Sequence, residues 1–228
     1  MENAKKLIID TLKTKACLKQ DVFKKTIEVF KGFKFEAEKL TAELKKEMDN
    51  VDKDIVIELV DKGDYEFHIK FGGDILVFYM HTNIFDFEKS HSIWKTSYVK
   101  EDELRAYCGM INIYNFLADS FKYNRLNDLG YLVGRLFLNK ELHYFVEGKR
   151  QLGFLYNDFV NEIINNNKIR NIIESSILYS MDFDLLTPPY DTMKVVSVNE
   201  VNEVTNAMSI KTGKRLGFKF NADNDQIE

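Results

Sequence analysis

The stretch from Tyr65 to His81, YEFHIKFGGDILVFYMH, predicts a β-hairpin at the centre of the fold. In its first half every second residue is aromatic or aliphatic and the residues between are polar, which is typical of a half-buried strand. Gly72-Gly73 then supplies a tight turn. The second half is almost continuously apolar, so we expect that strand in the middle of a sheet.

Other strand patterns stand on both sides of this hairpin. Ile55 to Val60 precedes it, and a second hairpin is expected from Leu129–Leu138 and Glu141–Glu147 around a turn at Asn139-Lys140. Residues 110–120 fit a strand and a helix equally well. Weaker patterns predict further strands at residues 92–98, 151–155, 193–198 and 216–220.

Two long helices are predicted at the two ends of this strand-rich region. Residues 3 to about 50 read as helix, and from Val22 to Leu44 apolar or small residues recur at steps of three and four. At 1.5 Å per residue, the 20–48 part would be about 43 Å long. Its stripe either covers the protein's own sheet or pairs with a second copy, and we expect a homodimer through the 20–48 helix. The second helix is expected near 157–179, with Asn157 or Asp158 as its N-cap.

This order of elements predicts an α+β fold. Strands linked by hairpins, with helices at the ends, indicate an antiparallel meander sheet of about five to seven strands instead of a doubly wound sheet. We expect one domain over residues 1–228. Pro188-Pro189 is the clearest break, so residues 190–228 either form an appendage or complete the sheet.

Composition and charge narrow the class of protein. The 228 residues are 45% hydrophobic and 30% charged, with a formal net charge of −4. Because domains that bind nucleic acid are usually basic, a nucleic-acid partner is not expected. Cys17 and Cys108 lie far apart, which favours free thiols in a reducing compartment. The longest apolar run, Ile75 to Met80, is far shorter than a membrane span, and no secretory signal is recognisable, so we expect a cytoplasmic protein without a membrane partner.

The segment Glu147-Gly148-Lys149 resembles the acid-x-Lys end of a PD-(D/E)xK nuclease motif. In such enzymes two acids hold Mg²⁺ and the lysine stabilises charge at the phosphate. Asp128, nineteen residues before Glu147, would be the second acid on the neighbouring strand. However, no proline precedes Asp128, and acid-x-Lys arises easily by chance in a chain so rich in charge. The catalytic set Asp128, Glu147 and Lys149 is therefore kept as an alternative only.

A second acidic pattern lies after the first hairpin. Gly72-Gly73 followed by Asp86 and Glu88 superficially resembles a nucleotidyltransferase, but here the glycines open a strand and not the helix that such chemistry needs. Asp86, Glu88 and His91 could cluster on a loop, although nothing in their spacing fixes a metal ion. We therefore predict no metal site.

The leading expectation is a binding or interaction module without catalytic activity of its own. It would recognise a small ligand or a protein partner. No cofactor is expected for this module, and Mg²⁺ is expected only under the nuclease alternative. Trp94, the only tryptophan, stands beside the polar stretch 88–92 and could rim a pocket. Trp94 and Tyr144 are the candidate ligand-binding residues.

Overall fold

The computed structural model describes residues 2–149, 151–185, 187, 189–199 and 201. The α+β fold is confirmed: six strands form one antiparallel meander whose spatial order equals the chain order. The strands are β1 (Ile57–Asp61), β2 (Glu66–Phe71), β3 (Asp74–Met80), β4 (Gly109–Leu117), β5 (Tyr131–Leu138) and β6 (Tyr144–Gly148). The helices are α1 (Glu2–Thr11), a π-helical turn η1 (Leu12–Ala16), α2 (Cys17–Met48), η2 (Ser92–Lys95), α3 (Ser97–Glu101), η3 (Glu103–Ala106), α4 (Ala118–Lys122), α5 (Gln151–Leu155), α6 (Asn166–Met181) and α7 (Tyr190–Met193).

The hairpin that the sequence places at the centre forms as predicted. Phe67 on β2 lies opposite Phe78 on β3, and the two rings stack with centroids 4.6 Å apart. Gly72 in the turn has φ of +58°, a left-handed conformation that glycine adopts without steric cost. The ambiguous residues 110–120 contain both predicted elements, because β4 runs directly into α4.

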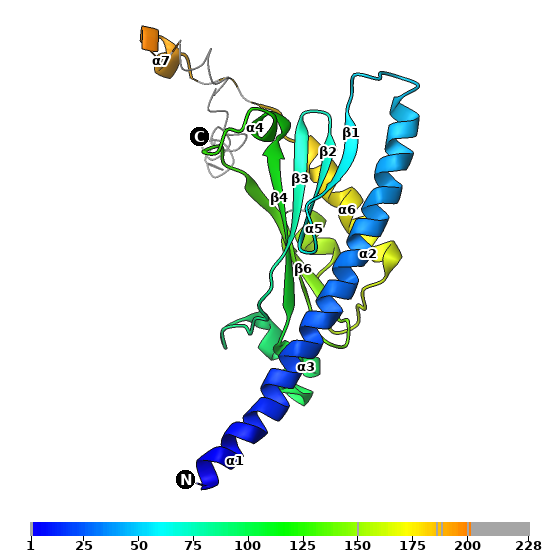
Figure 1. Ribbon diagram of the computed structural model, residues 1–228, viewed down its shortest axis with the longest axis vertical. Coiled ribbons are helices and arrows are strands. Elements are labelled where there is room, and N and C mark those ends of the chain that lie inside the picture. The colour runs from blue at the N-terminus through cyan, green and yellow to red at the C-terminus, as the bar shows by residue number, and fades with distance from the viewer. Residues whose placement is uncertain (1, 150, 186, 188, 200, 202–228) are drawn as a thin grey trace, which may run out of the picture.

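Helices α2 and α6 cover one face of the sheet, as Figure 1 shows, and the main core lies between. The stripe on α2 points into this core, with Phe30, Phe33 and Ala37 fully buried against the sheet residues. Of the two roles expected for the stripe, the structure shows that it covers the chain's own sheet. The homodimer through the 20–48 helix stays a prediction, and it would need surface other than this stripe.

Two of the strands predicted before residue 160 are wrong. Residues 92–98 form the short helices η2 and α3, because the side chains of His91 and Thr96 accept hydrogen bonds from the N–H groups of Ile93 and Val99 and so start helical turns. Residues 151–155 form α5 instead of prolonging β6. After α5 the chain returns along the outer edge of β6, where Val146 N–H donates to the carbonyl of Tyr156 at 2.7 Å.

The second long helix begins later than predicted. Asn165, expected in its middle, is the N-cap of α6, and its side chain accepts from Lys168 N–H at 3.0 Å. Asparagine competes for backbone hydrogen bonds, so it favours a helix start over a helix interior. The strand predicted at 193–198 is absent from the described residues there, and the one predicted at 216–220 lies outside them. Within the described part, no helix has the length and apolar character needed to cross a bilayer.

The second face of the sheet, opposite α2 and α6, is covered only in part, by two separate apolar clusters. One patch packs the segment 85–107 and Phe159 against Phe137 and Phe145. Another packs α4 beside Ile75 and Val77. On β2, His68 lies on this face, 4% exposed, with Nε2 2.6 Å from Glu66 Oε1 and its ring against Phe121.

His68 is expected to make stability depend on pH. Burial lowers the pKa of its imidazole below the ordinary value of 6.5, and the bond to Glu66 opposes this only partly. The unfolded chain then binds the proton more readily, so stability is fully present above about pH 6.5 and falls as pH drops through the lowered pKa. Urea unfolding at about pH 7.5 and 5.5 should show a smaller loss in His68→Gln than in the wild type. Equal losses in both proteins would contradict the assignment.

Candidate functional site

An open cleft lies on the second face of the sheet, between the strands and the segment Phe85–His91. Its volume is about 320 Å³, within the range of small-molecule sites. The lining residues are Phe85, Asp86, Phe87, Glu88, Ser90, His91, Met110, Arg135, Phe137 and Glu147. Apolar rings and charged groups thus meet in one hollow.

Strand register places the floor of the cleft. Arg135 on β5 lies directly opposite Glu147 on β6, and Phe137 lies opposite Phe145. Because successive side chains of a strand point to opposite faces, Arg135, Phe137 and Glu147 share the cleft face while Leu136 turns into the core.

The wall of the cleft is fixed by backbone and ring contacts. Phe85 forms an antiparallel bridge to Cys108, with hydrogen bonds of 2.8 and 2.9 Å. The Phe87 ring packs edge-on against Phe137 with centroids 5.0 Å apart. Trp94 Nε1–H donates to the Phe87 carbonyl at 3.1 Å, and this bond helps to fix the backbone of the wall.

A His91–Glu147–Arg135 cluster occupies the polar side. Arg135 Nε donates to Glu147 Oε2 at 2.5 Å, and His91 Nε2 lies 3.3 Å from Oε1. Ile93 N–H donates to His91 Nδ1 at 3.2 Å, which assigns the ring proton to Nε2. Glu147 therefore accepts from both neighbours, and both ring nitrogens of His91 are engaged.

The three residues of the nuclease alternative are not gathered into one site. The Asp128 carboxylate, 7% exposed, pairs with Arg125 Nε at 2.8 Å and accepts from Ser120 Oγ at 2.7 Å. Glu147 is bound by Arg135 and His91 instead, and Lys149 is exposed. Among the described residues, no group of three or more His, Cys, Asp or Glu side chains could hold a metal ion. The arrangement does not favour the nuclease alternative.

The two candidate ligand-binding residues lie outside the cleft. Tyr144 is 1% exposed in the main core, on the opposite face of the sheet, and burial raises the pKa of its hydroxyl to about 12. Trp94 supports the wall without lining it, and the Lys89 ammonium lies 3.2 Å from the centre of its ring. Asp86, Glu88 and His91 all line the cleft, but they form no metal-binding group among the described residues. Arg135 and Phe137, which complete the site, were not predicted.

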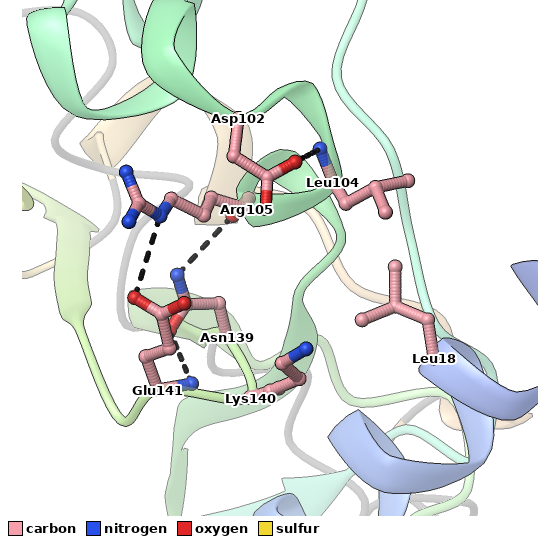
Figure 2. Close-up of a pocket in the computed structure, with 7 residues that line it drawn as sticks. All are labelled: Leu18, Asp102, Leu104, Arg105, Asn139, Lys140 and Glu141. Carbon is pink, nitrogen blue, oxygen red and sulfur yellow. Dashed lines mark hydrogen bonds and ion pairs between the residues drawn. The ribbon is translucent and has the colours of Figure 1, made fainter. Parts of the chain in front are cut away.

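A second hollow, drawn in Figure 2, is filled by a hydrogen-bond network. The Asn139 side chain accepts from Glu141 N–H at 3.0 Å and donates to the Arg105 carbonyl at 3.3 Å, while Arg105 Nε lies 3.4 Å from Glu141. The remaining space is about 10 Å³, room for no more than one water molecule. This cluster joins the β5–β6 turn to η3 and is not a ligand site.

Comparison of the chain with models of protein families, with curated proteins and with solved structures finds no match.

Proposed function

We propose that the protein is a binding module that holds a small organic ligand in the cleft between Phe85–His91 and the sheet. The observation that carries this proposal is the meeting of Phe87, Phe137 and Met110 with charged groups in one open hollow of about 320 Å³. Small-ligand sites are concave and largely apolar, with a few polar groups that fix orientation. The cleft has that composition.

The state of the nearby reactive groups favours binding over catalysis. A general base needs a free nitrogen within reach of the substrate proton, and both nitrogens of His91 already have partners. Cys108 lies behind the wall, is fully buried, and has a thiol pKa raised by burial and then by Asp86. A buried neutral thiol is a poor nucleophile.

We also propose a cytoplasmic location. Both cysteines are free, Cys17 exposed and Cys108 buried, which suits a reducing compartment.

Blocking the cleft should abolish ligand binding without unfolding the protein. Ser90 is exposed and lines the cleft, so Ser90→Trp places an indole in the hollow; Ser97→Trp makes the same change at an exposed serine outside it. A panel of fragment-sized aromatic compounds, screened by saturation-transfer NMR, should give hits that bind the wild type and Ser97→Trp but not Ser90→Trp. Hits that bind all three proteins equally, or no hits at all, would contradict the proposed function.

A further inference from the structure

We infer that the ligand of this cleft is a small organic cation with an apolar body, such as an aromatic amine. This inference rests on the proposed function and adds the chemical class of the ligand. It follows from the charges of the lining residues, from the bond between the Arg135 guanidinium and Glu147, and from the aromatic rings that border the cleft.

The lining is negative. Among its described residues, three carboxylates, those of Asp86, Glu88 and Glu147, stand against one guanidinium, that of Arg135. Arg135 is bound to Glu147 at 2.5 Å, so the positive charge of Arg135 is compensated by the negative charge of Glu147. The charges of Asp86 and Glu88 are then left to face the cleft. Both carboxylates are exposed at the open side of the cleft, so they attract an opposite charge modestly and in a way that salt screens.

The nearest lysine of the wall does not cancel these charges. Lys89 follows Glu88, but its ammonium lies over the Trp94 ring at 3.2 Å and 3.4 Å from Glu103. It is held on the far side of the segment by a ring and a carboxylate. An ammonium brought by a ligand would meet Asp86 and Glu88 without this competitor.

The ring surfaces suit the same class of ligand. Phe87 lies 5.0 Å from Phe137 and 4.7 Å from the stacked imidazole of His91, so the hollow is bordered by aromatic faces and edges. A cation is attracted to the face of an aromatic ring within about 6 Å. An apolar ligand body would cover Phe137 and Met110, which line the hollow.

An anion is disfavoured on the same grounds. Its natural partner, Arg135, already donates to Glu147, and a ligand carboxylate would stand beside Asp86 and Glu88, two acids with no ion pair among the described residues. Repulsion of that kind is how a site rejects a ligand of similar shape. The cleft should therefore discriminate by charge among molecules of one size.

Three probes of nearly equal shape test the inference on the full chain: benzylamine, benzyl alcohol and benzoate, titrated by NMR at low salt. Benzylamine should bind about tenfold tighter than benzyl alcohol, and benzoate most weakly. Its advantage should shrink at high salt, because exposed charges are screened. In Asp86→Asn/Glu88→Gln the preference for benzylamine should disappear while benzyl alcohol binds as before. Glu38→Gln, an exposed acid on α2 away from the cleft, is the matched control and should keep the preference.

The outcomes separate the two proposals. If benzyl alcohol or benzoate binds as tightly as benzylamine, and Ser90→Trp abolishes that binding, the cation inference is overturned and the proposed function stands. If no probe binds in a way that Ser90→Trp abolishes, both are overturned. Preference for benzylamine that survives Asp86→Asn/Glu88→Gln also overturns the inference, because the charge would then come from elsewhere.

Discussion

Replacing Phe78 with alanine should lower the free energy of unfolding by about 3–5 kcal/mol, the usual cost of deleting a buried aromatic ring. Phe78 is fully buried, stacks on Phe67 at 4.6 Å and lies 5.9 Å from Phe33 of α2. It joins the central hairpin to the covering helix, so its removal leaves a cavity between two rigid elements. Urea unfolding followed by circular dichroism measures the loss.

Tyr79→Ala is the matched control for this prediction. Tyr79 is the next residue of β3, also aromatic, but it points to the other face and is 37% exposed. Its truncation should cost about 1 kcal/mol or less, since less apolar surface leaves the core. A similar cost for both variants would mean that the hairpin is not anchored through the α2 face.

Asp128→Ala should destabilise the protein by about 3–5 kcal/mol, because it breaks a buried ion pair from one side. The side chains of Arg125 and Asp128 are 6% and 7% exposed. Without the carboxylate, the Arg125 guanidinium loses this buried ion pair and Ser120 Oγ loses this acceptor. Thermal and urea unfolding of the purified variant give the size of the effect.

Asp119→Ala serves as the control, since Asp119 is an exposed acid in the same α4 region. It should change the free energy of unfolding by less than about 0.5 kcal/mol. The pair also tests the nuclease alternative. A shared metal site predicts that Mg²⁺ raises the Tm of the wild type and not that of Asp128→Ala. The ion-pair role predicts that Mg²⁺ leaves both Tm values unchanged.

The strands were predictable where alternation or a continuous apolar run is long. Tyr65 to His81 has both patterns and a glycine turn, and it folded as expected. Two of the errors, at residues 92–98 and at the start of the 157–179 helix, fall where a side chain binds the backbone locally. His91, Thr96 and Asn165 each accept a backbone N–H and start a helical turn, which the apolar pattern of residues 92–98 and 157–179 does not reveal.

The site was only partly predictable because its residues meet through sheet register. Arg135 and Glu147 are partners only when β5 and β6 pair in the observed register. The alternation of side chains along a strand is enough to place Tyr144 and Glu147 on opposite faces of the sheet, because residues three apart on a strand point to opposite sides. The sequence places Asp86 and Glu88 on a loop, but their position at the cleft depends on the bridge between Phe85 and Cys108.

The central claim is that a small molecule binds between Phe85–His91 and the sheet, and methionine-methyl NMR tests it most directly. Met110 lines the cleft, whereas Met80 is fully buried on the other face of the sheet. With benzylamine, benzyl alcohol and benzoate titrated in turn, the Met110 methyl signal should shift saturably with at least one probe while that of Met80 stays fixed. A Met110 signal unmoved by all three probes, or equal shifts at both methionines, would contradict the account.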